Sequence, residues 1–144
     1  MPDITYVFYN FAYNLLTKKI SDLSDNTNTH IKVMLISNVP DLNTWNSKVD
    51  VTGEITGTGY TAGGQELTNK LVTKSQNITI FTADNILWSN STLLARCGVI
   101  YDDTPASDSD KKLISYVDFG GIRETSDSNF RIIWSSNGIF QLPA

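Results

Sequence analysis

Cysteine and histidine are nearly absent from this 144-residue sequence, which contains one of each, Cys97 and His30. A single cysteine excludes a disulfide within the chain. One cysteine and one histidine cannot supply the ligands of a Cys/His zinc site. A Ser-His-Asp triad would have to use His30, and no G-x-S-x-G motif occurs in the sequence. We therefore expect no catalytic residues, no metal ion and no cofactor, and we interpret His30 as a solvated residue at the end of a loop.

Charge of either sign is also sparse. Charged residues make up 18% of the chain, and the formal net charge is −4. An acidic chain without a basic stripe is poorly suited to bind nucleic acid or an anionic membrane. No apolar run is long enough to span a bilayer, and the first residues lack the order of a signal peptide. The sequence therefore predicts a protein made in the cytoplasm, with no nucleic-acid partner and no membrane partner.

The longest apolar run, residues 93–101, predicts the central strand of the fold. Turn-forming residues precede it, and Asp, Asp, Thr and Pro follow it. Both of its faces are apolar, which is typical of a strand in the middle of a sheet covered on both sides. Cys97 is then a buried, unreactive thiol. With regular alternation, one face carries Leu93, Ala95, Cys97, Val99 and Tyr101.

Several other short stretches, rich in β-branched and aromatic residues, alternate with turn signals. The N-terminal segment instead mixes two spacings and predicts one helix at about residues 6–18. The length suits one domain, residues 1–144. The pattern predicts a mainly β fold, which is a single antiparallel β-sandwich or small barrel with that N-terminal helix. Asn137-Gly138 is expected to close a hairpin between the last two strands. The expected additional strands are 31–37, 49–56, 67–73, 77–81, 113–119, 130–134 and 139–142.

A glycine-rich patch covers residues 57–64. Its first six residues match the G-x-G-x-x-G/A pattern of dinucleotide-binding proteins, which requires a helix directly after the glycines. Here two more glycines and a strand-like segment follow, so we interpret the glycines as positions of positive φ or of a bulge. Tyr60 lies amid them, either as an interface anchor or folded inward.

Acidic residues gather in residues 102–110. They could hold a hard cation such as calcium, but the EF-hand order is absent, and a solvated acidic loop is favoured. The two carboxylates of a glycoside hydrolase need only meet in space. The sequence singles out no such pair.

The segment EITGTGYTAGGQEL, residues 54–67, resembles a stretch found in small virion structural proteins of tailed bacteriophages. Three further blocks agree in order and spacing, so the resemblance extends along almost the whole chain. The expected N-terminal helix and the strand that follows it also fit. Cys97 stands where the resemblance leads us to expect an aromatic residue such as Tyr. This difference affects the packing of the core and not the resemblance to the family. The blocks are residues 83–88 leading into 92–103, residues 113–121, and residues 130–134 with 137–142.

The resemblance implies a non-enzymatic structural protein of a phage virion, located at the capsid surface in preference to the tail. The first hypothesis is a capsid decoration or cement protein that binds across major capsid protein subunits and stabilises the head. The alternative is a tail- or fibre-associated adaptor that contacts host glycans, and the third is a glycan hydrolase. The resemblance transfers no catalytic or ligand-binding residue.

We also expect a homo-oligomer or lattice member whose contacts come from two segments. The N-terminal segment has more aromatic residues than one amphipathic face needs, and the glycine-rich patch presents Tyr60 with little charge nearby. A weakly charged interface carries little desolvation cost. The expected interface residues are Tyr6, Tyr9, Phe11, Gly57, Gly59 and Tyr60.

Overall fold

The structure, a computed structural model, describes residues 3–143 and is mainly β, with 46% of residues in strands and 9% in helices. This confirms the fold class predicted from the sequence. Two short 3₁₀ helices, η1 (Lys48–Asp50) and η2 (Asp108–Asp110), accompany one α-helix, α1 (Phe11–Leu16). The strands are β1 (Ile4–Val7), β2 (Ile31–Ile36), β3 (Gln65–Glu66), β4 (Leu71–Ser75), β5 (Ile78–Thr82), β6 (Ile86–Ser91), β7 (Leu94–Asp102), β8 (Leu113–Glu124), β9 (Ser128–Ile132) and β10 (Phe140–Pro143).

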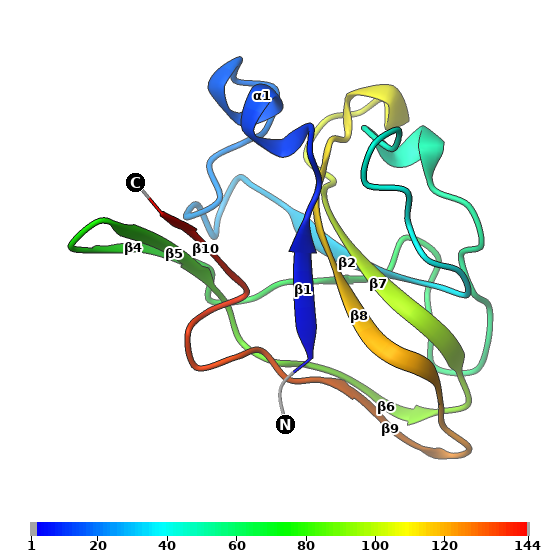
Figure 1. Cartoon of the computed structure of the whole chain (residues 1–144). Coiled ribbons are helices and arrows are strands. Elements are labelled where there is room, and N and C mark those ends of the chain that lie inside the picture. Colours follow the sequence, from blue (N-terminus) through cyan, green and yellow to red (C-terminus); the bar gives the residue numbers. More distant parts are fainter. Residues whose placement is uncertain (1–2, 144) are drawn as a thin grey trace.

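The strands form three antiparallel sheets. Five strands pair in the order β1-β8-β7-β2-β3, three in the order β10-β5-β4, and two as β6-β9 (Figure 1). The larger core cluster contains Val33 of the first sheet, Phe81 and Phe140 of the second, and Trp88 and Phe130 of the third. The two smaller sheets therefore cover one face of the five-stranded sheet, which gives a sandwich-like arrangement.

The opposite face of the five-stranded sheet carries a second core cluster. Met34, Cys97, Val99 and Tyr116 belong to it, and partly buried residues of segment 42–51 pack against it. Strand β7 thus lies between β8 and β2 with both faces covered, as its sequence predicts. Cys97 has no exposed surface, and its burial raises the pKa of the thiol to about 11.

The N-terminal helix is shorter than the predicted span 6–18, and its expected first turn is a strand. Residues Ile4–Val7 form β1, which pairs with β8 from Ile4 opposite Asp118 to Val7 opposite Ser115. This tetrapeptide consists of strand-forming residue types, and the Tyr6 ring stacks on Tyr116 with 5.3 Å between centroids. The helix begins only at Phe11, and Lys18, with φ 58°, follows its end.

The strand predicted at residues 49–56 is wrong. Residues 48–50 form η1, and among the described residues the segment pairs with the sheet only through an isolated β-bridge between Ile36 and Glu54. Val49 is 61% exposed, and Gly53 adopts φ 79°, a conformation that interrupts an extended strand. Alternation of valines was therefore a misleading signal for a segment that lies over the sheet as a loop.

The final hairpin is also different from the prediction. A turn does close between Ser135 and Gly138, whose N–H donates to the Ser135 carbonyl at 2.9 Å. However, β9 pairs with β6, while β10 pairs with β5. The turn therefore carries the chain from one sheet to another, and both Phe130 of β9 and Phe140 of β10 pack in the larger core cluster. In contrast, β4 and β5 do form a hairpin, with its turn at residues 76–77, although β4 begins at Leu71 and not at residue 67 as predicted.

The regular alternation predicted along the central strand breaks in its first half. Ala95 packs in the larger cluster, whereas Cys97, two residues later, packs in the second cluster. The pairing with β8 shifts between these positions, from Ala95 opposite Arg123 to Cys97 opposite Asp118. A register shift of this kind re-aims side chains, which a period-two reading of the sequence does not anticipate.

Candidate functional site

Many large apolar side chains are exposed on β1, on α1 and in the turn between them. Tyr13 and Leu16 are three residues apart in α1 and share one face of the helix, and Tyr9 lies in the turn just before it. The face presented by Phe11 and Asn14 is buried instead. We call the exposed set the N-terminal surface; it comprises Ile4 (62% exposed), Tyr6 (42%), Tyr9 (66%), Tyr13 (61%) and Leu16 (82%).

Two of the expected interface residues, Phe11 and Tyr60, face the interior. Phe11 is 1% exposed and meets Phe140 edge-on at 5.4 Å between ring centroids. Tyr60 packs against the larger cluster, with its ring 6.2 Å from that of Trp88. Of the expected N-terminal contacts, Tyr6 and Tyr9 lie at the surface.

The glycine-rich loop, residues 57–64, is held by a network of hydrogen bonds. The Tyr60 hydroxyl donates to Glu54 Oε2 at 2.8 Å and accepts from the Leu35 N–H at 3.1 Å. Burial, followed by the hydrogen bond to Glu54, raises the pKa of Tyr60 above its ordinary value. The Gly63 N–H donates to the same carboxylate oxygen at 2.7 Å, and the Gly63 carbonyl accepts from the buried Tyr101 hydroxyl at 2.6 Å. Both partners therefore hold the loop against the five-stranded sheet.

The glycines of this loop serve the backbone. A Cβ at Gly57 would lie 2.5 Å from the Thr92 carbonyl oxygen, and Gly59 has φ 86°. A Cβ at Gly64 would lie 1.9 Å from the Val33 carbonyl oxygen, so only glycine allows the loop to approach β2 this closely. The segment that follows is the short strand β3, not the helix that a dinucleotide site requires.

Three carboxylates of the acidic segment, those of Asp102, Asp103 and Asp108, are engaged by groups of the same chain. Asp102 is fully buried and accepts the Ser21 N–H at 2.7 Å. Asp103 forms ion pairs at 2.9 Å with both Lys32 and Lys111. Burial tends to raise the pKa of Asp103, but the hydrogen bonds from the two lysines outweigh it and lower the pKa. Across residues 3–143, no three His, Cys, Asp or Glu side chains gather where they could hold a metal ion.

The exposed His30 side chain lies 3.0 Å from Glu66 on β3. Asp118, on β8, accepts a hydrogen bond from Arg96 on β7. Burial would raise the pKa of Asp118, whereas hydrogen bonds from Arg96 and from the Gly120 N–H lower it. These polar pairs link neighbouring segments of the five-stranded sheet. We interpret them as contacts that stabilise the sheet.

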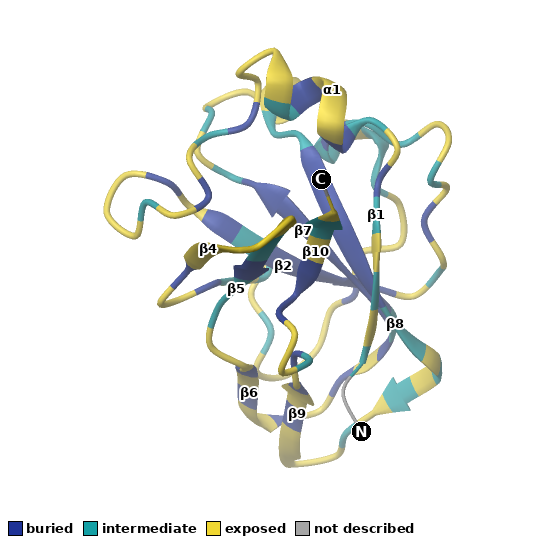
Figure 2. Ribbon diagram, turned by 60° about the vertical axis from the view of Figure 1, so that its left-hand side comes forward, coloured by how far each residue is buried: buried dark blue, intermediate teal, exposed yellow. Residues whose placement is uncertain are grey.

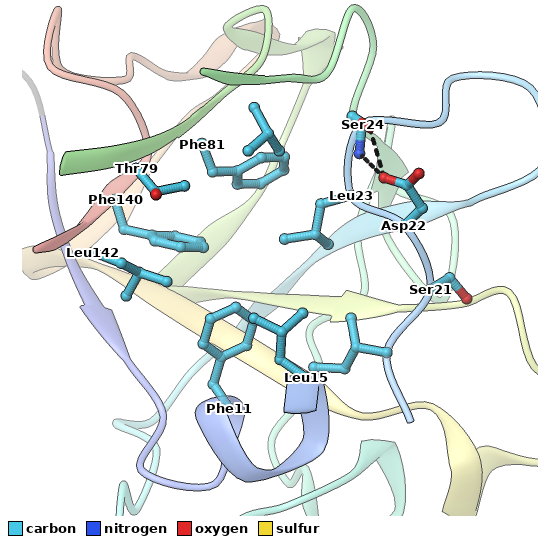
Figure 3. Close-up of a pocket in the computed structure, with 12 residues that line it drawn as sticks. Phe11, Leu15, Ser21, Asp22, Leu23, Ser24, Thr79, Phe81, Phe140 and Leu142 are labelled. Atoms are coloured by element: carbon cyan, nitrogen blue, oxygen red, sulfur yellow. Dashed lines mark hydrogen bonds between the residues drawn. The ribbon is translucent and has the colours of Figure 1, made fainter. Parts of the chain in front are cut away.

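An apolar pocket of about 280 Å³ opens between α1 and the three-stranded sheet. Figure 3 shows Phe11 and Leu15 rising from the helix on one side, and Phe140, Phe81 and Thr79 on the other. The segment after the helix closes a third side, with Leu23 pointing inward. Asp22 lies at this rim, where its carboxylate accepts from the Ser24 N–H and hydroxyl.

Comparisons with known proteins found no matching family model, no matching curated protein and no matching solved structure. Within the described residues, no helix combines the length and apolar character needed to cross a membrane.

The contacts were expected within residues 4–11, so sequence reasoning missed two members of the N-terminal surface, Tyr13 and Leu16. The spacing of Tyr13 and Leu16 was a usable signal, because residues three apart within α1 share a helix face. The apolar pocket had no signal in the sequence, since its walls come from α1 with the following loop, the β4–β5 hairpin and β10, which are three regions far apart along the chain.

Proposed function

We propose that this protein is a non-enzymatic structural component of a tailed-phage virion, most simply a capsid decoration protein that binds across coat subunits. The N-terminal surface is the observation that carries the docking role. Five large apolar side chains are exposed within residues 4–16, and concentrated apolar exposure on a folded domain marks an interaction site. The virion context is supported by the resemblance of the sequence blocks to phage structural proteins.

The geometry of this surface suits repeated docking on a lattice. The Tyr6 ring is already stacked on Tyr116, and Lys19 lies over the Tyr13 ring at 4.9 Å from its centroid. Aromatic side chains that are held in place before binding lose little conformational entropy when a partner covers them. In this proposal the interface keeps Tyr6 and Tyr9 and gains Tyr13 and Leu16. The buried Phe11 supports the surface from beneath.

The test is cosedimentation of the purified protein with virion heads that lack it. We expect Tyr9→Ser and Leu16→Ser each to weaken binding by about tenfold or more, because each removes an exposed apolar anchor. Val49→Ser is the matched control, since Val49 is also highly exposed but lies on η1 and is not one of the five residues of this surface. All three variants should keep the wild-type circular dichroism spectrum and melting temperature.

Three results would overturn the proposal in different ways. Normal head binding by both anchor variants would mean that the N-terminal surface is not the docking site. Binding to isolated tails but not to heads would favour the adaptor role instead. Copy number separates the same two roles, because a head decoration is present on the order of hundreds of copies, whereas a tail component follows the tail's small rotational symmetry.

A further inference from the structure

Strand β4 is an exposed edge. It is the outer strand of the β10-β5-β4 sheet, and all five of its residues are exposed. Figure 1 shows the β4–β5 hairpin projecting from the body of the molecule. An edge strand presents unpaired backbone N–H and C=O groups and can accept another extended segment.

The outward-facing positions of β4 follow from the hairpin geometry. Its two-residue turn makes Ser75 and Ile78 a hydrogen-bonded pair, so hydrogen bonding to β5 alternates back along β4. Val72 and Lys74 therefore direct their backbone groups away from β5. Lys70, two residues earlier, follows the same alternation. The Asn26 side chain binds the outward backbone groups of Lys70: it accepts from the Lys70 N–H at 2.8 Å and donates to the Lys70 carbonyl at 3.0 Å.

Asn26 thus does at Lys70 what a neighbouring strand would do. Within residues 3–143, no hydrogen bond reaches the outward backbone groups of Val72 or Lys74. These are the next two positions along the same edge. The edge is therefore partly satisfied by the chain itself and open over the length of two further pairings.

The open part of the edge adjoins the apolar pocket. Val72 lies opposite Phe81, and both side chains line the pocket together with Thr79 of β5. Residues directly opposite each other on neighbouring antiparallel strands project from the same face. A residue paired with Val72 on an added strand would therefore project at the pocket mouth. At about 280 Å³ the pocket is larger than the roughly 150 Å³ cavities that hold benzene, so one leucine, methionine or phenylalanine side chain can enter it.

Lys74 identifies the second requirement of the partner. It is exposed, lies on the pocket side of β4 and forms no ion pair among the described residues, and residues 71–82 contain no carboxylate. A lysine on an edge strand discourages pairing between identical edges. A carboxylate opposite Lys74, two residues from the apolar side chain, would instead form a favourable cross-strand pair.

We propose that the β4 edge and the adjoining pocket bind an extended segment of another protein by strand addition. The segment carries an apolar residue opposite Val72 and an acidic residue opposite Lys74, and therefore has an acidic-x-apolar pattern when it runs antiparallel to β4. Main-chain hydrogen bonds supply affinity, and the pocket and Lys74 supply specificity. The inference is independent of the virion role, because it requires only a partner with such a segment.

The probe is a library of random seven-residue peptides selected on the immobilised full-length protein, and the selected peptides are then titrated by fluorescence polarisation. Val72→Pro blocks the edge and keeps the β4–β5 ladder, because the Val72 N–H points outward. Thr79→Phe fills the pocket from within the chain. Thr73→Ala is the matched control, since its side chain lies on the opposite face of β4. Circular dichroism checks that each variant is folded.

We expect selected peptides to show the acidic-x-apolar spacing and to lose about tenfold or more in affinity for Val72→Pro and for Thr79→Phe, with no loss for Thr73→Ala. Lys74→Glu should change the selected acidic residue to a basic one. If Val72→Pro does not fold, the results for Lys74→Glu and Thr79→Phe test the proposal without it. Equal enrichment on wild type and on both blocked variants overturns the proposal. So does a wild-type dimer in sedimentation that Val72→Pro converts to monomer, since the occupant would then be a second copy.

Discussion

Strands β7 and β4 have opposite places in the fold, although both contain consecutive apolar residues. In β7 every residue from Cys97 to Asp102 is buried, and the strand has a partner on each side. In β4 every residue is exposed, and the strand has one partner. Figure 2 shows the contrast in colour, with β7 largely dark blue and β4 yellow. The comparison teaches that position in the sheet, more than apolar content, decides whether a strand supports the fold or remains available for binding.

The largest expected difference between the two strands is in access to a thiol reagent. Cys97 in β7 should react only when the core opens, which costs a large part of the unfolding free energy. A cysteine placed in β4 by Ser75→Cys should react at the rate of an exposed thiol. In the native S75C protein, the cysteine at position 75 is therefore expected to label fast. Cys97 should label at least about a thousand times more slowly. Equal rates at both sites would show that β7 is not the protected centre of the fold.

The next difference concerns cavity formation. Ile100→Ala should lower the free energy of unfolding by about 2–5 kcal/mol, because Ile100 is fully buried in the larger cluster. Leu71→Ala should cost less than about 0.5 kcal/mol, because the Leu71 side chain is 51% exposed. Urea unfolding of both variants measures the two losses in the free energy of unfolding. Similar losses in both would erase the distinction between a central strand and an edge strand.

A smaller difference is expected from single hydroxyl groups. Tyr101→Phe removes the buried donor to the Gly63 carbonyl and should cost about 1–2 kcal/mol, because that carbonyl is left without this partner. Thr73→Val on β4 should change stability by no more than about 0.5 kcal/mol. Thermal unfolding compares the two. A neutral Tyr101→Phe would indicate that the other hydrogen bonds of the glycine-rich loop hold it without this one.

The smallest difference should appear on acidification. Hydrogen bonds from basic side chains lower the pKa values of Asp103 and Asp118 in the folded protein. A carboxyl group with a lowered folded pKa stabilises the fold above its unfolded pKa of about 3.9 and loses that contribution as the pH falls through its folded pKa. Global stability should therefore decline below about pH 4. The β4–β5 hairpin contains no carboxylate. Local opening of the hairpin, measured by amide exchange and corrected for intrinsic rates, should not share this decline.

The parts of the fold that follow from local pattern were predictable. The central strand, the burial of Cys97 and the β4–β5 hairpin each depend on residues that are neighbours in the sequence, or on a short turn between them. The N-terminal surface was predictable in part, because Tyr6 and Tyr9 stand out as an excess of aromatics. Phe11 shares that excess but faces the core, and it differs from Tyr9 in having no hydroxyl group that needs a hydrogen-bond partner when buried.

The sequence by itself determined that the chain would form many short strands, with one run apolar enough on both faces to be central. Only the tertiary structure decided the pairing partners: β1 lies beside β8, β10 leaves β9 for β5, and Asn26 covers the edge at Lys70 but not at Val72. The physical reason is that local preferences among neighbouring residues are weak. Burial and hydrogen bonding across long sequence separations contribute more free energy, and they choose among the arrangements that the local pattern allows.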